Sequence, residues 1–284
     1  MALVPVTELL LKAEAGGYAV GAFNANNTEI VQAIAMAALQ ERSPVIMQAS
    51  QGAISYAGLE YITGMVKLAA DEYDVPIALH LDHGTDFDQV VKCIRSGFSS
   101  VMYDGSKHSL EENIAMTNKV LDIARPVGVS VEAELGKIGG TEDNVHVDAK
   151  DALYTDPEEA RYFVEKTGVE SLAVAIGTAH GQYKGEPKLD LQRLAKIKSL
   201  VNIPIVLHGS SGVPDDTIRS AIAGGVCKVN IDTNIREAFV WKMREVIAAK
   251  PDEIDPRKIL GPARDAAVEV IRQKIRVFGS AGKA

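Results

Sequence analysis

The chain has 284 residues, of which 46% are hydrophobic and 24% charged, a composition typical of a globular protein with a full core. Its formal net charge is −8 and it contains no basic cluster, which argues against nucleic acid as a partner. The two cysteines, Cys93 and Cys227, lie in apolar contexts at a spacing that fits no metal motif, so we interpret them as reduced core thiols.

The first residues, MALVPVTELLLKAEAGG, have no basic segment ahead of an apolar one. Residues 7–15 are predicted to form a helix with an N-cap rather than a signal peptide. No apolar run reaches the roughly 20 residues that a membrane span needs. We therefore expect a cytoplasmic protein with no membrane partner.

Eight short runs, rich in apolar and β-branched residues, recur along the chain, at residues 18–24, 43–50, 75–83, 99–105, 128–136, 170–177, 202–209 and 225–232. Continuous apolar runs of this kind are typical of parallel strands that are buried on both faces. Amphipathic segments lie between them, such as 27–43 and 156–168, and the second begins with an Asp N-cap and a proline and ends at Gly168. This alternation predicts an α/β fold, a (β/α)8 (TIM) barrel that forms one domain over residues 1–284. An open doubly wound sheet is the alternative.

The stretch after Lys250 holds two further pieces. We expect residues 251–263, PDEIDPRKILGPA, to be a connector broken by prolines. Residues 264–279 have apolar positions at helical spacing and are predicted to form an additional C-terminal helix. A helix beyond the eighth unit is expected to pack against the barrel or against a second subunit.

Three of the six histidines occupy equivalent places at the ends of predicted strands. His83 ends the third run, His180 follows the sixth and His208 ends the seventh, and each is followed directly by glycine. The C-terminal strand ends of a (β/α)8 barrel surround one active site. Three imidazoles with an open fourth position are the pattern of a catalytic zinc, which we predict here. The alternative is three unrelated histidines satisfied by local hydrogen bonds.

Asp82 directly precedes His83, and its carboxylate is predicted to reach the same mouth as a general acid or base, or to orient a ligand. His80 is interpreted as a buried structural residue. His108 and His146 lie in polar loops and are interpreted as solvated.

Small polar segments follow the last two predicted strands, GSSG at 209–212 and NIDTN at 230–234. Loops at these places form the recurrent phosphate site of such barrels. Lys184, four residues after His180, is predicted to add positive charge there, or else to be a solvated loop lysine.

The segment VEAELGKIGGTED, residues 131–143, begins as the fifth strand and is predicted to become a mobile glycine-rich loop. Glu142 at its far end is placed to swing into a nearby site. Glu132 and Glu134 share one face of the strand, and buried carboxylates are costly unless they are paired or bound to a cation. We expect them to support the metal ligands from behind, to bind a second metal, or to form structural ion pairs.

These segments together resemble a known family. HLDHG, VEAELGKIGGTED, AIGTAHGQYKGEP, VLHGSSG and KVNIDT are similar to the class II fructose-bisphosphate and tagatose-bisphosphate aldolases, and the likeness runs from GAFNANN to the final FGSAGKA. The resemblance implies a zinc ion on His83, His180 and His208. It implies that Asp82 exchanges a proton with the C4 hydroxyl of the sugar and that Glu142 handles the proton on the dihydroxyacetone phosphate carbon.

The resemblance also implies a substrate site. Dihydroxyacetone phosphate would be bound by Gly181, Lys184, Gly209, Ser211, Asn230, Asp232 and Thr233, with a monovalent cation (Na⁺ or K⁺) near the phosphate. Asn24 and Ser50 would lie near the other end of the substrate. A homodimer or homotetramer is the habit of the family.

The segment NIDTNIREAF resembles the fructose-specific members, in which the aspartate and the later arginine are expected. Tagatose-specific relatives tend to carry a small residue and a lysine there. We therefore expect reversible cleavage of fructose 1,6-bisphosphate to dihydroxyacetone phosphate and glyceraldehyde 3-phosphate, a lyase step of glycolysis and gluconeogenesis. Asp232 would read the hydroxyls near C4, and Arg236 would clamp the distal phosphate. Tagatose 1,6-bisphosphate is the alternative, and Gln51 is a departure, because some relatives carry a more basic residue there.

Two other kinds of protein compete with this interpretation. A metal-free Schiff-base aldolase would need a lysine inside the barrel, for which Lys228 is the candidate. A sugar-phosphate-binding barrel without catalysis would leave Asp82 and Glu142 as bystanders.

Overall fold

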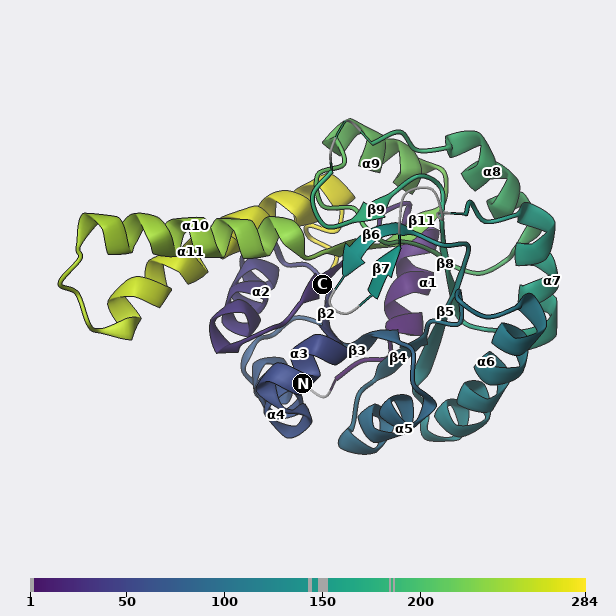
Figure 1. Cartoon of the computed structure of the whole chain (residues 1–284), viewed down its shortest axis with the longest axis horizontal. Helices are drawn as coiled ribbons and strands as arrows, with labels where there is room; N and C mark the ends of the chain where they lie inside the picture. The colour runs from purple at the N-terminus through teal and green to yellow at the C-terminus, as the bar shows by residue number, and fades with distance from the viewer. Residues whose placement is uncertain (1–2, 143–144, 148–152, 184, 186) are drawn as a thin grey trace.

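A closed barrel of eight parallel strands forms the centre of the protein (Figure 1). The computed structural model describes residues 3–142, 145–147, 153–183, 185 and 187–284, with 141, 142 and 145–147 described by their backbone only. The barrel strands are β1 (Val20–Asn24), β2 (Val45–Ser50), β3 (Ile77–Gly84), β4 (Ser100–Tyr103), β5 (Ser130–Leu135), β8 (Ser171–Val174), β10 (Ile205–Leu207) and β11 (Val226–Ile231). Each coincides with one of the eight predicted runs, and β11 pairs with β1 to close the ring. The (β/α)8 barrel is confirmed and the open sheet is excluded.

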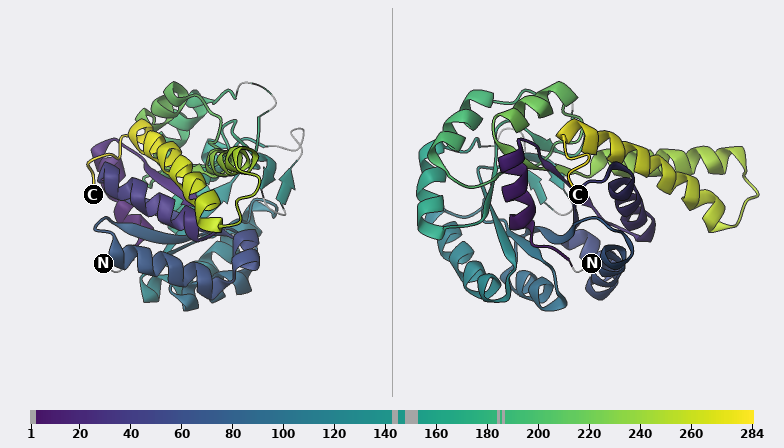
Figure 2. Two further views of the ribbon diagram at one scale, coloured as in Figure 1. Left: turned by 90° about the vertical axis from the view of Figure 1, so that its left-hand side faces the viewer. Right: turned by 180° about the vertical axis from the view of Figure 1, so that it is seen from behind.

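Helices cover the outside of the barrel and connect its strands (Figures 1 and 2). They are α2 (Thr28–Glu41), α3 (Gln51–Ala57), α4 (Leu59–Glu72), α5 (Phe87–Ser96), α6 (Leu110–Ala124), the 3-10 turn η1 (Arg125–Val127), α7 (Pro157–Thr167), α8 (Leu191–Leu200) and α9 (Asp215–Ala223). The predicted cap of α7 is present, since the Asp156 side chain accepts hydrogen bonds from the first backbone N–H groups of that helix. Outward-facing strand residues such as Phe23, Met47 and Leu79 are fully buried in the core beneath these helices.

The helix α1 (Val6–Gly16) closes the end of the barrel at which the strands begin (Figure 2). Its apolar side chains pack on residues near the strand starts, among them Val20, Ile46 and Cys227. The predicted helix is present, but its predicted cap is wrong. The N-cap is Pro5, which makes no side-chain hydrogen bond, and the Thr7 hydroxyl donates to Ser130 Oγ at 2.8 Å. This packing leaves the opposite, C-terminal end of the barrel as its open mouth.

A small second sheet contains the glycine-rich segment. In it β6 (Gly139–Glu142) pairs antiparallel with β7 (Val145–Val147) and parallel with β9 (Ala179–His180). The sequence predicts a loop here, and that prediction is wrong for Gly139–Glu142. Gly140 lies opposite His180 with φ at +105°, and a Cβ on it would collide with the His180 carbonyl. Glycine is therefore needed at this position for close backbone pairing.

The last two helices, α10 (Thr233–Ala249) and α11 (Pro256–Phe278), run out from the barrel side by side as an arm (Figure 1). The additional C-terminal helix is confirmed, but the predicted connector is wrong from Pro256 onward. Asp255 caps α11 by accepting the N–H of Arg257 at 3.0 Å, and Pro256 occupies a first-turn position that needs no N–H. Pro262 lies inside the helix, which packs against α10. The helix also contacts α2, α9 and β1, so it does pack against the barrel.

The cysteine prediction is confirmed, because Cys93 and Cys227 are buried free thiols. Burial raises the pKa of each thiol to about 11, which keeps both protonated. Among the described residues, no helix has both the length and the apolar character that crossing a membrane requires.

Candidate active site

Three histidines from three segments meet at the open mouth of the barrel. His83 lies near the end of β3, His180 in β9 beyond β8, and His208 directly after β10. One ring nitrogen from each lies within 4.8 Å of the others. The His83 ring centroid is 4.9 Å from that of His180 and 4.6 Å from that of His208. The fold thus brings the predicted cluster together.

An irregularity in β3 directs the side chains of both Asp82 and His83 toward the open mouth of the barrel. Neighbouring residues in a regular strand point to opposite faces. Here the pairing of β3 with β4 shifts register between Leu81 and Gly84, and His83 has φ at +48°. This left-handed conformation costs on the order of 1 kcal/mol or more in a residue other than glycine. A Cβ at Gly84 would lie 2.5 Å from the Met102 carbonyl, so only glycine fits immediately after the irregularity.

The two buried histidines are oriented so that a cation fits between them. His208 Nε2 lies 2.8 Å from a Glu132 carboxylate oxygen, and His83 Nδ1 lies 3.4 Å from one of Asp104. Carboxylates only accept hydrogen bonds, so these two ring nitrogens carry the protons. The remaining nitrogens, His208 Nδ1 and His83 Nε2, then face each other with their lone pairs at 2.9 Å. Two nitrogens on one tetrahedral zinc ion lie roughly 3.3 Å apart, so the spacing suits such an ion.

The electrostatics keep these groups in the forms that metal binding requires. Burial lowers the pKa of His208 to about 4, against the opposing hydrogen bond to Glu132, so its imidazole is neutral. Burial alone would raise the pKa of Glu132, but the Lys228 charge and the His208 hydrogen bond outweigh it and hold that pKa below its usual range. Burial would likewise raise the pKa of Asp104, but its interactions with His83 and its hydrogen bonds with Ser106 together outweigh burial and lower that pKa. Both carboxyls are therefore ionised.

Asp82 is fully buried among amide donors. Asn24 Nδ2 and Gln48 Nε2 each donate to its Oδ2 at 3.0 Å, and Asn230 Nδ2 donates to its Oδ1 at 3.2 Å. Gln48 also donates to Asn24 Oδ1 at 2.7 Å. Oδ1 of Asp82 lies 3.9 Å from His83 Nε2. The amides thus fix a carboxylate beside Nε2 of His83, the nitrogen that faces His208.

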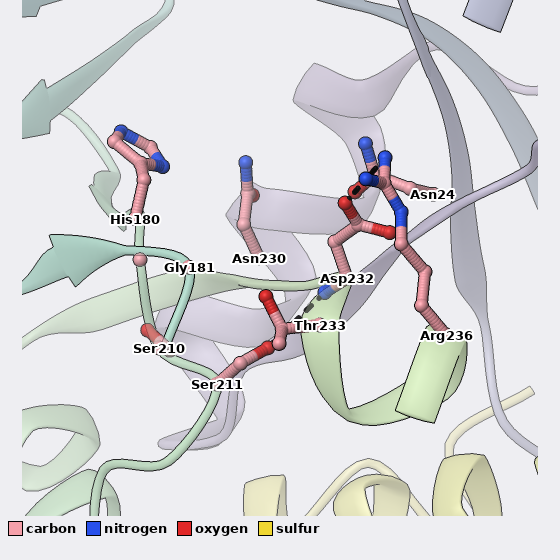
Figure 3. Close-up of a pocket in the computed structure, with 10 residues that line it drawn as sticks. Asn24, His180, Gly181, Ser210, Ser211, Asn230, Asp232, Thr233 and Arg236 are labelled. Atoms are coloured by element: carbon pink, nitrogen blue, oxygen red, sulfur yellow. Dashed lines mark hydrogen bonds and ion pairs between the residues drawn. The ribbon is translucent and has the colours of Figure 1, made fainter. Parts of the chain in front are cut away.

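A pocket next to His180 is formed by the segments that follow β10 and β11 (Figure 3). Ser211 Oγ accepts the N–H of Asp232 at 3.2 Å and so joins the two segments where α10 begins. The first N–H groups of a helix favour an anion. Gly209 has φ at +61°, and a Cβ on it would lie 2.6 Å from the Ala179 carbonyl. The predicted phosphate-binding residues that line the pocket are Gly181, Gly209, Ser211, Asn230, Asp232 and Thr233, together with Asn24 and Arg236.

Arg236 lies one helical turn after Asp232 and forms an ion pair with it, Nη2 to Oδ2 at 2.7 Å. Its side chain is 44% exposed, which leaves the guanidinium accessible from solvent. Figure 3 shows this pair on the side of the pocket away from His180. The two ends of the pocket are therefore chemically different, with imidazole at one end and guanidinium at the other.

Not every predicted residue reaches the pocket. Ser50 is buried, and its hydroxyl caps α3 by accepting the N–H of Ala53 at 3.2 Å; it is not among the described residues that line the pocket. Gln51 donates to Thr85 Oγ1 at 3.0 Å. Lys184 lies outside the described residues. The side chain of Glu142 also lies outside them, although its backbone ends β6.

Glu132 and Glu134 have different surroundings. Glu132 forms an ion pair with Lys228 through one oxygen and contacts His208 Nε2 through the other, both at 2.8 Å. Glu134 Oε2 lies 3.8 Å from Nδ1 of His83 and of His208, and the group His83, Asp104 and Glu134 also has metal-binding geometry. Lys228 is fully buried and paired with Glu132. Its amine is therefore not presented to the pocket in the way that a Schiff-base mechanism requires.

Sequence reasoning missed two residues of the site, Asp104 and Gln48. Asp104 follows the fourth strand and precedes Gly105, the same pattern as the three histidines, so its position in the sequence was a usable signal. Gln48 is a polar residue in the apolar run 43–50, and a buried amide needs hydrogen-bond partners. That requirement indicates polar neighbours but does not say that one of them is Asp82.

Comparison with known proteins agrees with this geometry. Residues 4–283 match the family described as fructose-bisphosphate aldolase class-II. The fructose-bisphosphate aldolase of Thermus caldophilus is 48% identical over 99% of this chain and 100% of that protein, and the probable fructose-bisphosphate aldolase of Bacillus subtilis is 48% identical over 100% of both. The crystal structure of the YdjI aldolase from Escherichia coli K12 superposes with a TM-score of 0.87 at 33% identity, over 99% of both chains. The histidines lie at the mouth of the barrel, and the family match covers almost the whole chain. The chain therefore belongs to the class II fructose-bisphosphate aldolase family.

Proposed function

We propose that the protein is a metal-dependent aldolase that reversibly cleaves fructose 1,6-bisphosphate between C3 and C4, giving dihydroxyacetone phosphate and glyceraldehyde 3-phosphate. The observation that carries the proposal is the approach of His83 Nε2 to His208 Nδ1, 2.9 Å apart beside the buried carboxylate of Asp82. The family and the names of the relatives support the sugar.

His83, His180 and His208 hold one Zn²⁺ ion in this proposal. When bound, the ion stabilises the negative charge that develops on substrate oxygens as the C3–C4 bond breaks. Three neutral imidazoles leave the ion strongly electrophilic, which suits this task.

Asp82 accepts the proton of the C4 hydroxyl during cleavage and returns it during condensation. Its amide neighbours hold the carboxylate in one orientation, so the base is placed before substrate arrives. Glu142 handles the proton on the dihydroxyacetone phosphate carbon. Its segment is tied to the strand of His180 by the pairing of Gly140 with that residue.

The pocket after β10 and β11 binds the phosphate of the dihydroxyacetone half, with Lys184 and a Na⁺ or K⁺ ion offsetting its charge in a chain of net charge −8. Asn230 Oδ1 is buried and has no hydrogen-bond partner among the described residues, so it is available to a substrate hydroxyl. Arg236, at the other end of the pocket, takes the second phosphate. Ser50 lies near that end in the same proposal.

We also propose that the protein acts in the cytoplasm, in glycolysis and gluconeogenesis, as a homodimer or homotetramer. The α10–α11 arm supports the assembly. On it Trp241 is 66% exposed, and Ile254, between the two helices, is 92% exposed. Exposed apolar side chains on a projecting element are typical of a protein interface.

Cleavage of fructose 1,6-bisphosphate is expected to be lost after exhaustive chelation and restored by adding zinc back. The assay compares kcat/KM for fructose and tagatose 1,6-bisphosphates under the same conditions. A higher value for fructose supports the assigned sugar, and a higher value for tagatose reassigns it. Cleavage that survives complete metal removal would contradict the zinc site and return attention to Lys228. No cleavage of either sugar by the zinc-loaded protein would favour a binding protein.

Asp232→Ala is expected to lower cleavage of fructose 1,6-bisphosphate much more than cleavage of the tagatose isomer. The two sugars differ only at C4, and Asp232 is proposed to contact the hydroxyls there. The substitution also releases Arg236 from its ion pair, so Arg236→Gln is the matched control. It should raise KM for both sugars to the same extent. Equal losses on both sugars in Asp232→Ala would remove this residue as the discriminator.

A further inference from the structure

Below the three histidines, a connected set of buried polar groups crosses the barrel interior. Glu132 accepts from His208 Nε2 through Oε1 and from Lys228 Nζ through Oε2, both at 2.8 Å. Lys228 Nζ also lies 3.4 Å from His80 Nε2, and His80 Nδ1 lies 2.8 Å from Ser100 Oγ. All of these side chains are almost completely buried. None of them except His208 has a role in the proposed chemistry.

A purely structural function explains this set poorly. The interior of a (β/α)8 barrel is ordinarily filled by branched apolar side chains. Burying an ion pair such as Lys228 with Glu132 carries a large desolvation penalty, and apolar residues of similar volume often give equal or greater stability. The set ends on a metal-binding histidine, which points to the metal site as its purpose.

The directions of the hydrogen bonds follow from the donors present. An ammonium group only donates, so Lys228 fixes one Glu132 oxygen as an acceptor, and it also fixes His80 Nε2 as an acceptor. The His80 proton is then on Nδ1, where it donates to Ser100. The other Glu132 oxygen accepts from His208 Nε2. His208 is thereby held with its lone pair on Nδ1, the nitrogen that faces His83.

We propose that Glu132 and Lys228 are positioning residues that hold His208 in the tautomer and orientation that present Nδ1 to the metal. Hydrogen-bond partners behind a ligand histidine commonly change metal affinity by about 10- to 100-fold. This inference deepens the proposed function and rests on it, because it assumes the zinc ion on the three histidines.

Glu132→Gln is expected to weaken zinc binding about 10- to 100-fold. The glutamine keeps the size of the side chain, but the lysine attracts its oxygen and repels its NH₂ group. The NH₂ group is therefore turned toward His208 Nε2, which must now accept. The His208 proton moves to Nδ1 and blocks the nitrogen that binds the metal.

Adding Lys228→Met to Glu132→Gln is expected to restore zinc binding to within about tenfold of the wild type. Without the lysine, the amide rotates so that its oxygen faces His208 Nε2 and its NH₂ group faces the acceptor nitrogen of His80. The double variant also contains no unpaired buried charge at this place, so it supplies a measurement even if the single variant is unstable. A residue with a merely structural role would not show recovery on removing a second member of the set.

The experiment uses the full-length protein stripped of metal. Zinc affinity is measured by competition with a chromophoric chelator, and the visible spectrum of the Co²⁺ form reports the ligand geometry. Lys274→Met is the matched control, because it removes another buried lysine, paired with Asp215 at 3.0 Å and away from the histidines. It should lower the unfolding temperature and leave both metal readouts unchanged.

Wild-type zinc affinity and an unchanged Co²⁺ spectrum in Glu132→Gln would overturn the inference. So would a double variant that binds zinc as weakly as the single variant. A wild-type protein that binds no zinc is a different result, since it removes the proposed function and the inference together.

Discussion

Replacing His83 with alanine is expected to reduce cleavage of fructose 1,6-bisphosphate by roughly 10⁴-fold, because a bound metal contributes several kcal/mol and each 1.36 kcal/mol is a factor of ten in rate. The ring centroid of His83 lies within 5 Å of those of the other two histidines. Its loss therefore leaves only two imidazoles to hold the ion. The measurement is kcat at saturating substrate together with the zinc content of the purified variant.

The matched control is His108→Ala, which removes an exposed histidine that belongs neither to the three-histidine cluster nor to the pocket lining. It is expected to retain both zinc and activity. A His83→Ala protein that works within tenfold of the wild type while holding no zinc would show that the chemistry does not depend on the ion.

Asp82→Asn is expected to lower kcat by about 10²- to 10⁴-fold while zinc stays bound. Asparagine matches aspartate in size, but in either orientation its NH₂ group replaces an oxygen that accepts from an amide, from Asn230 or from Asn24 and Gln48, and it cannot take the C4 hydroxyl proton. The loss of kcat with retained zinc distinguishes this variant from His83→Ala. Steady-state kinetics and metal analysis on the same preparation provide the measurement.

Gln48→Ala gives a second comparison for the same carboxylate. The amide holds Asp82 but does not exchange a proton, so its removal should cost less in kcat than the loss of the carboxylate. Unchanged kcat in Asp82→Asn, with zinc present, would remove Asp82 as the proton acceptor.

The sequence predicts the barrel and the histidine cluster because both depend on one regularity. Parallel strands buried on both faces leave a continuous apolar pattern, and the residues at their C-terminal ends meet at one mouth. His83, His180 and His208 each follow such a pattern and precede glycine. The substrate, in contrast, depends on the family resemblance, since strand ends alone do not say which sugar fits between them.

The features that sequence reasoning missed depend on tertiary contacts. Residues 256–263 contain two prolines, yet they are helical as the first turns of α11, which packs against α10 and α2. The β6 segment looks like a loop in isolation and becomes a strand because β7 and β9 are available to pair with it. The contact of Lys228 with Glu132 joins residues 96 positions apart, and neither strand alone indicates it.

The irregularity in β3 has a consequence for attempts to transplant this chemistry into another scaffold. Copying three histidines and an aspartate onto the strand ends of a regular (β/α)8 barrel would place Asp82 and His83 on opposite faces of their strand. The recipient would also need the register shift, a histidine with φ near +48° and the glycine after it that tolerates the Met102 carbonyl. The unit that can be transferred is therefore a distorted strand with its neighbour, rather than a set of side chains.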